Sequence, residues 1–146
     1  MGNVSKGVGV IGNRNYVGRT KYAQAKYDFA VHGGAQGAIT LTGDTVPSGA
    51  IVTDCFIVLD TVVTSGGTPT ISIGIEGAAD IRAAASFASA PALNATTGAK
   101  RSAILTATTT PLVVTTADRQ VTITVGTADL TAGVFRVVLA YVEVAA

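Results

Sequence analysis

A two-residue period of apolar side chains is the feature that most limits what this chain can fold into. The isoleucines between Thr70 and Glu76 alternate with polar or small residues, and the apolar residues between Gln120 and Gly126 do so again. Alternation at period two gives an extended segment one apolar face, which predicts β-strands that are buried on one side. Gly, Pro, Ser or Asp interrupts the pattern roughly every 8–15 residues from Lys26 onward, which is typical of an all-β sandwich or barrel.

Strand composition recurs in eight segments, which we predict to be strands: 26–31, 37–42, 50–63, 70–76, 101–108, 111–114, 120–125 and 134–144. Eight strands in a single domain suit a jelly-roll-like β-sandwich. Segments 50–63 and 134–144 are apolar at both parities, so we expect them to be covered on both faces or bulged. A short helix is expected in the alanine-rich stretch 78–90, because Ala favours helices over strands.

The first 27 residues differ from the rest of the chain in charge. Five of the ten basic residues lie there, and no acidic residue accompanies them. The remaining residues hold five Lys or Arg against nine Asp or Glu, a net charge of −4. Glycines recur through residues 1–22 and oppose a stable helix or strand. We therefore predict two parts, an extended basic N-terminal arm of residues 1–25 and a β-sandwich body of residues 26–146.

The surface chemistry of the body points to association. Only 13% of the residues are charged, about half of the usual ~25%, and the mean hydropathy is +0.48. So few charges do not cover a free surface in the way that keeps a small domain soluble. We therefore expect a homo-oligomer or a protein that is covered by a partner. No apolar stretch approaches the ~20 residues of a membrane span, so no membrane association is expected.

No residue set predicts catalysis, a cofactor or a metal. The stretch Gly7–Gly12 matches the dinucleotide-binding pattern G-x-G-x-x-G, but too few residues precede it to form the strand that this motif requires. His32 is the only histidine and cannot form a metal site alone. Cys55 lies among apolar neighbours beside Asp54, which favours a small buried side chain over a reactive thiol. We predict that the protein is not an enzyme and binds no cofactor.

The basic arm is the only strong candidate for binding. Lys and Arg interleaved with Tyr can lie along an acidic protein surface, or can hold phosphates and stack on bases. Docking on a protein is favoured, because five charges over 27 residues are sparse for a nucleic-acid arm; a solvated tail is the remaining alternative. The predicted partner-binding residues are Lys6, Arg14, Tyr16, Arg19, Lys21, Tyr22 and Lys26.

Two stretches of the body carry a family resemblance: Leu41–Asp54 continuing through Thr64–Gly74, and Asp129–Val142. Together they resemble the capsid decoration (cement) proteins of tailed bacteriophages. The resemblance implies a jelly-roll-like body, a homotrimer, the major capsid protein as partner, and a place on the virion surface after synthesis in the host cytoplasm. Two alternatives stay open: a tail-fibre, head-fibre or receptor-binding module, and a single-jelly-roll coat protein with a genome-binding arm.

Overall fold

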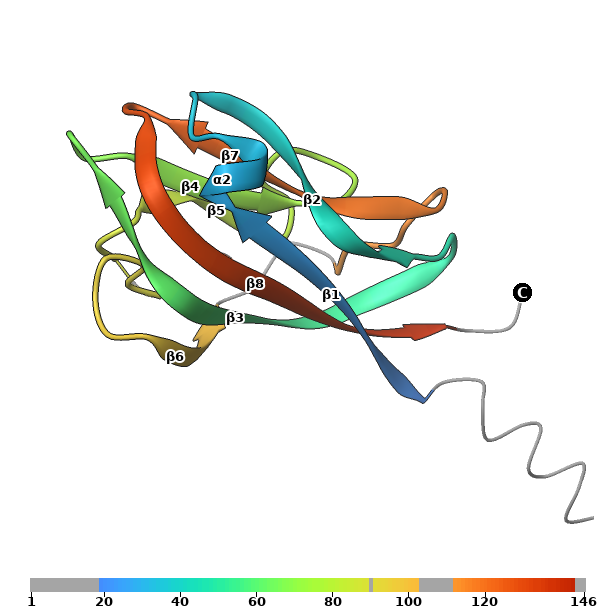
Figure 1. Ribbon diagram of the computed structural model, residues 1–146. Coiled ribbons are helices and arrows are strands. Elements are labelled where there is room, and N and C mark those ends of the chain that lie inside the picture. Colours follow the sequence, from blue (N-terminus) through green and yellow to red (C-terminus); the bar gives the residue numbers. More distant parts are fainter. Residues whose placement is uncertain (1–18, 90, 103–111, 144–146) are drawn as a thin grey trace, which may run out of the picture.

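The computed structural model describes residues 19–89, 91–102 and 112–143, and most of these residues lie in β-strands (Figure 1). One four-residue helix, α2 (Phe29–His32), lies among the strands. The strands are β1 (Thr20–Asp28), β2 (Gly37–Val46), β3 (Ala50–Ser65), β4 (Thr70–Gly74), β5 (Arg82–Ser86), β6 (Gly98–Ser102), β7 (Arg119–Gly126) and β8 (Leu130–Glu143). The all-β class predicted from the two-residue period is confirmed.

The strands form one continuous antiparallel sheet in the order β5-β4-β7-β2-β1-β8-β3-β6, which curls between β2 and β1 into two layers, here called the sheets β1-β8-β3-β6 and β2-β7-β4-β5. Among the described residues, the only strand pairs that connect these two sheets are Ala25–Gly43 and Lys26–Thr42, between β1 and β2. β1 pairs with β8, β2 with β7, β3 with β6 and β4 with β5, so the chain resembles one long hairpin rolled up on itself. This nested pairing is typical of a jelly roll and confirms the predicted jelly-roll-like β-sandwich.

The core lies between the two sheets and is built by the inward parity of each strand. In β7, Val121, Ile123 and Val125 are buried, as the alternation predicts. Tyr27 is fully buried, and its ring stacks on Phe135 with ring centroids 5.0 Å apart. The Tyr27 hydroxyl donates a hydrogen bond to the carbonyl oxygen of residue 33 at 2.8 Å. Burial and the nearby acidic side chain of residue 28 raise the pKa of Tyr27 to about 12.

β1 begins at Thr20, six residues before the start predicted for the first strand. Its inward residues include Ala23 and Ala25, and alanine is a weak signal for a strand. The strand ends at Asp28, whose side chain accepts the backbone N–H of Ala30 at 3.1 Å and caps α2. The predicted strand 26–31 is therefore wrong in its bounds, because a helix cap interrupts it.

The helix predicted within 78–90 is wrong. Residues 82–86 form β5 instead, which pairs with β4. Asp80 accepts the backbone N–H groups of residues 75, 76 and 77 at 2.8–2.9 Å, which fixes a tight turn after β4. Pairing with β4 therefore overrides the helix preference of alanine. In segment 111–114, Val114 makes a single β-bridge to Ile51, and residues 103–108 of the predicted strand 101–108 lie outside the described residues.

Candidate assembly surface

The structure places four of the seven predicted arm residues at β1. Arg19 directly precedes the strand, and Lys21, Tyr22 and Lys26 lie within it. The other three lie outside the described residues: Lys6, Arg14 and Tyr16. The binding role of all seven stays a prediction. The structure does show that regular β-structure begins at Thr20, within the segment predicted to be the arm.

The parity of β1 decides which side chains are available to a partner. Ala23, Ala25 and Tyr27 face the core, whereas Tyr22 and Lys26 point outward. The basic and aromatic residues that looked like an irregular arm in the sequence thus form, in part, the outer face of a regular strand. This face belongs to the sheet β1-β8-β3-β6.

Both described lysines of β1 have an acidic partner in their own chain. The ammonium of Lys21 lies 3.0 Å from the carboxylate of Glu143, and that of Lys26 lies 3.1 Å from the carboxylate of Asp28. Pairing with Lys26 and a backbone N–H hold the pKa of Asp28 below its usual value. Tyr22, in contrast, is 63% exposed, so its side chain is accessible.

An apolar row crosses the end of this sheet beside Tyr22. Val142 of β8 pairs with Ile51 of β3, and Ile51 bridges to Val114. Residues paired across strands point to the same face, so the side chains of Val142, Ile51 and Val114 lie in a row on the outer face. Val142 pairs with Thr20 of β1 and is therefore the diagonal neighbour of Tyr22. Leu112 has the parity of Val114, and the two are 43% and 51% exposed. We call this set the root patch, because it lies at the start of β1: Tyr22, Ile51, Leu112, Val114 and Val142.

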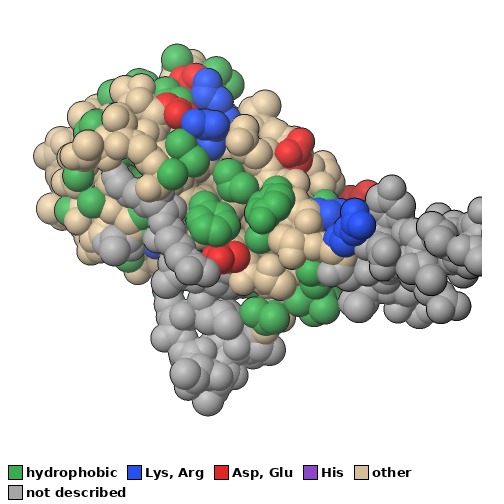
Figure 2. Space-filling model, turned by 90° about the horizontal axis from the view of Figure 1, so that it is seen from below, with side chains coloured by type: hydrophobic (Ala, Val, Ile, Leu, Met, Phe, Trp, Pro, Cys, Tyr) green, Lys and Arg blue, Asp and Glu red, His purple; other side chains and the backbone are tan. Residues whose placement is uncertain are grey.

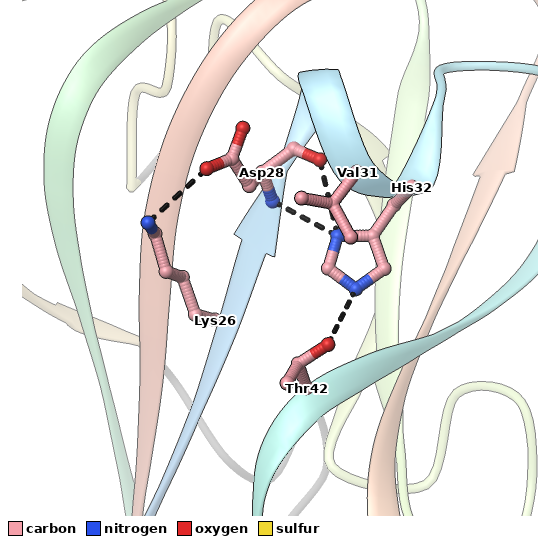
Figure 3. Close-up of a pocket in the computed structure, with 5 residues that line it drawn as sticks. All are labelled: Lys26, Asp28, Val31, His32 and Thr42. Carbon is pink, nitrogen blue, oxygen red and sulfur yellow. Dashed lines mark hydrogen bonds and ion pairs between the residues drawn. The ribbon is translucent and has the colours of Figure 1, made fainter.

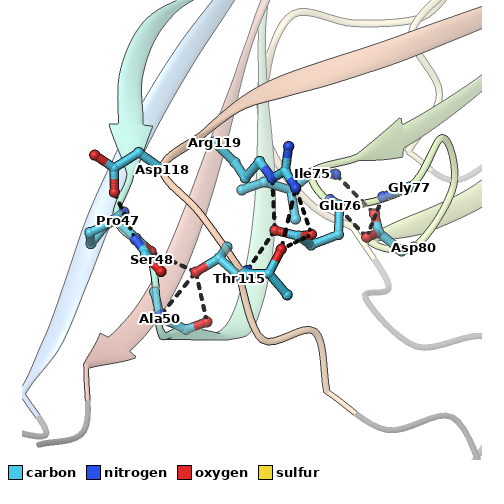
Figure 4. Close-up of polar contacts among 11 residues, drawn as sticks. Pro47, Ser48, Ala50, Ile75, Glu76, Gly77, Asp80, Thr115, Asp118 and Arg119 are labelled. Atoms are coloured by element: carbon cyan, nitrogen blue, oxygen red, sulfur yellow. Dashed lines mark hydrogen bonds and ion pairs between the residues drawn. The ribbon is translucent and has the colours of Figure 1, made fainter. Parts of the chain in front are cut away.

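Polar contacts fix the segment that carries Leu112 and Val114 (Figure 4). The hydroxyl of Thr115 donates to the carbonyl oxygen of Pro47 at 2.6 Å and accepts the backbone N–H of Ala50 at 2.9 Å. Thr115 is 2% exposed, so these bonds are shielded from water. The carboxylate of Asp118 accepts the backbone N–H of the residue after Pro47 at 2.9 Å. The root patch therefore rests on a held segment rather than on a loose loop.

A second clamp ties this segment to the turn after β4. Glu76 accepts four hydrogen bonds: from the backbone N–H and hydroxyl of Thr116, at 2.8 Å each, and from Nε and Nη2 of Arg119, at 2.9 and 3.1 Å. The bond from Arg119, followed by those from Thr116, lowers the pKa of Glu76 to about 2. Figure 4 shows Glu76 beside Asp80, which caps the same turn.

Figure 2 shows the molecule from below, with hydrophobic side chains gathered in the middle of the visible face and charged side chains around them. One charged pair of the outer sheet face is Arg136 of β8 and Asp60 of β3. The guanidinium donates two hydrogen bonds to the carboxylate, at 2.9 and 2.7 Å, and these hold the pKa of Asp60 below its usual value. The two apolar parities of 50–63 and 134–144 thus supply the core on one side and this partly exposed face on the other.

An open pocket of about 330 Å³ lies beside α2, between β1 and β2 (Figure 3). Nδ1 of His32 lies 3.1 Å from both the backbone nitrogen and the carbonyl oxygen of Asp28, and Nε2 lies 3.1 Å from the hydroxyl oxygen of Thr42. Lys26 and Asp28 pair with each other at the rim. Because these polar groups bond to one another, few of them are left to recognise a ligand, and the pocket is a weaker candidate site than the root patch.

The described residues contain no cluster of three or more side chains that could hold a metal ion. Cys55 is fully buried, as expected. The sequence did not indicate that Arg82 is buried, and the residue is only 4% exposed. Burial lowers the pKa of Arg82. No helix in the described part of the chain is long and apolar enough to cross a membrane.

Sequence reasoning found Tyr22 but missed the rest of the root patch. The sequence did carry a signal for the remaining residues: segments 50–63 and 134–144 are apolar at both odd and even positions, and one of these two sets had to face outward. We expected cover or a bulge there. What the sequence could not show is that Ile51, Val114 and Val142 come from three segments that meet only through long-range pairing.

No protein-family model matches the chain, and no curated protein matches it. Solved structures of similar fold do exist. A chain of the cyanophage Pam1 capsid asymmetric unit is 25% identical, with a TM-score of 0.60 over 88% of this chain and 87% of that chain.

Two further chains are similar in fold at lower identity. One, from the acidic stable capsid structure of Helicobacter pylori bacteriophage KHP30, is 18% identical with a TM-score of 0.56 over 88% of this chain and 92% of that chain. The other, from the capsid of Ralstonia phage GP4, is 15% identical with a TM-score of 0.56 over 89% and 88%. The likeness covers most of each chain, so it concerns the whole jelly-roll body rather than a fragment.

Proposed function

We propose that this chain is a structural protein of a bacteriophage virion that decorates the outside of the capsid and stabilises it. The observation that carries the proposal is the fold shared over most of the chain with chains of three phage capsid structures. The resemblance of Leu41–Asp54, Thr64–Gly74 and Asp129–Val142 to decoration proteins of tailed phages supports the same class. The partner would be the major capsid protein.

The distribution of exposed apolar side chains favours decoration over building the shell. Among the described residues, four large hydrophobic side chains are exposed, and Tyr22, Leu112 and Val114 all belong to the root patch. A shell-building subunit contacts neighbours on several sides, whereas a single apolar surface suits attachment to a shell that already exists. The fibre, receptor-binding and coat-protein alternatives stay predictions, as does the homotrimer.

The mechanism we propose combines the root patch with the arm. Residues 1–18 can span at most about 60 Å when fully extended, enough to reach a neighbouring capsid subunit. Lys6, Arg14 and Arg19 would pair with capsid carboxylates, and Tyr16 would add an amphipathic anchor. Linking two weak contacts in one chain raises the avidity without any new contact.

The described lysines of the arm would contribute less than the sequence predicted. Lys21 and Lys26 are already paired with Glu143 and Asp28. A capsid carboxylate would have to compete with these partners, and exposed ion pairs are worth little each. The main anchoring role therefore falls on the residues before β1 and on Tyr22.

The test compares the full chain with a truncation of residues 1–18 on capsids that lack the protein, imaged by electron microscopy. The cut leaves all of β1 in place, so thermal unfolding of the truncated chain should match that of the full chain. We expect extra density on the outer capsid surface with the full chain and clearly less with the truncation.

Two results would count against the proposal. Density inside the shell, or as part of the shell lattice, would contradict decoration. Equal occupancy by both chains would contradict the role of the arm while leaving the decoration function in place.

A further inference from the structure

Among the described residues, no strand neighbours the first residues of β1 on the side away from β8. The β1–β8 pairing runs from Thr20 to Asp28, but β2 pairs with β1 only at Ala25 and Lys26. Gly43 packs against the carbonyl oxygen of Gln24, and beyond it β2 leaves β1 to pair with β7. Figure 1 shows the start of β1 projecting from the body beside the end of β8.

The carboxylate of Asp44 ends the β1–β2 ladder. It accepts the backbone N–H of Gln24 at 2.9 Å, in the place where the next strand pair would form. The N–H and carbonyl groups of Gln24 therefore point away from β8. Thr20 and Tyr22 share that parity, so their N–H and carbonyl groups point to the same side. In the described part of the chain no strand pairs with them there, and an open sheet edge of this kind is a template for strand addition.

We propose that a second copy of this chain fills this edge, with β1 antiparallel to β1 about a two-fold axis at Lys21. The β1-β8-β3-β6 layers of the two copies then join through the new β1–β1 pair. Thr20 of each copy pairs with Tyr22 of the other, and the two pairs exchange four N–H···O hydrogen bonds. This inference goes beyond the decoration function, because it concerns how copies of the chain associate with each other.

The edge is self-complementary, which argues for a second copy rather than a foreign strand. Tyr22 meets Thr20 of the second copy on the outer face, and aromatic pairs with β-branched residues stabilise sheets. Glu143 accompanies each Lys21 at 3.0 Å, so four charges of alternating sign meet at the axis. Gln24, held by Asp44, ends the overlap and so sets the register. Isologous contacts about a two-fold axis are the commonest way in which soluble proteins associate.

A cysteine substitution tests the register directly. In a non-hydrogen-bonded antiparallel pair the two Cα atoms lie about 4.5 Å apart, within the range that a disulfide spans. Lys21→Cys should therefore form a covalent dimer under mild oxidation, seen on a non-reducing gel. Gln24→Cys is the matched control, because with the axis at Lys21 the two copies of residue 24 lie far apart and should not cross-link. Native Cys55 is fully buried and does not interfere.

A proline substitution tests the hydrogen bonds. Tyr22→Pro removes an N–H that points away from β8, so the β1–β8 ladder is kept, and proline is tolerated at a sheet edge. Two lost hydrogen bonds per dimer should raise the dimer dissociation constant about 30-fold, as measured by analytical ultracentrifugation. Tyr22→Ala keeps the N–H and should weaken the dimer less.

Three results would overturn the pairing: a wild-type chain that stays monomeric, a dimer unaffected by Tyr22→Pro, or equal cross-linking of the two cysteine variants. If Tyr22→Pro fails to fold, the cross-linking result still decides. Because all of these measurements use the isolated chain, the pairing can fail while capsid binding stands.

Discussion

Single residues hold the root patch and the open edge of β1 in place, and Glu76, which acts on the root patch, is the clearest case. Its carboxylate accepts four hydrogen bonds from Thr116 and Arg119, and through them the turn after β4 restrains the segment of the root patch. The pKa of Glu76 is about 2, against 4.5 when unperturbed. The clamp is therefore charged and intact over the whole range in which most carboxylates titrate.

Substituting Glu76→Gln should lower the melting temperature at neutral pH, because the amide loses the charge-assisted bonds to Arg119. A lowered folded-state pKa stabilises the protein fully above the unfolded value of 4.5, and this stabilisation is lost as the pH falls toward about 2. The gap between wild type and variant should thus shrink across that window. Thermal melts from pH 7 to pH 2 measure it, with Asp129→Asn as a surface control; a gap that does not change with pH would contradict the account.

Tyr27 gives the opposite pH dependence. Its pKa is raised from 10.0 to about 12, so its protonated form stabilises the fold fully below pH 10, and this contribution is lost as the pH rises toward 12. Tyr27→Phe keeps the stacking on Phe135 but leaves the carbonyl oxygen of Gly33 without its donor, at a cost of about 1–2 kcal/mol. Denaturant titrations at pH 8 to 12 should show this cost falling with pH, and a constant cost would argue against the buried phenol.

At the scale of elements, the close approach of β1 and β2 at Gly43 decides how the two sheets join. A Cβ atom on Gly43 would overlap the carbonyl oxygen of Gln24, whereas a Cβ on Gly66 would meet nothing within 4 Å. Gly43→Ala should therefore destabilise the fold by about 1–3 kcal/mol. Gly66→Ala should be neutral or stabilising by about 0.4–1 kcal/mol. Chemical denaturation measures both, and equal stabilities would mean that β2 can shift away from β1 at no cost.

The sequence predicted the elements that carry their own period and missed those set by distant partners. β4 and β7 alternate in the sequence, and the structure confirms both as strands; β7 is buried on one side as predicted, whereas β4 is buried on both faces. The sequence of β5 favours a helix, and its strand conformation depends on pairing with β4. The first half of β1 has the composition of an irregular arm, and its strand conformation depends on pairing with β8. A cut at the predicted arm boundary would remove Thr20 to Ala25, six of the nine residues of β1 that pair with β8.

The candidate site was predictable in part for the same reason. Charge and aromatic content marked Tyr22 and the basic residues around it. The rest of the root patch assembles from β3, β8 and the segment before β7, whose adjacency is a property of the nested pairing and not of any local pattern. Asp44 is a further example, since its role in ending the β1–β2 ladder depends on a contact with Gln24, 20 positions earlier in the chain.

At the scale of the whole molecule, the jelly roll separates two exposed apolar side chains along the length of β1. Val114 lies in the root patch, beside the residues that pair with the start of the strand, and is 51% exposed. Val31 lies in α2, which follows the end of the strand, and is 71% exposed. The two valines therefore allow a matched test of which end of the body meets the capsid.

If the root patch is the attachment surface, Val114→Lys should reduce capsid occupancy by about tenfold or more, because a charge would be placed in a contact that excludes water. Val31→Lys, at the more exposed position, should leave occupancy unchanged. Neither substitution touches the core, so both variants should melt within a few degrees of wild type. Occupancy measured by co-sedimentation with capsids separates the cases: loss with Val31→Lys alone would move the attachment surface to the α2 end, and loss with neither would leave binding to the arm.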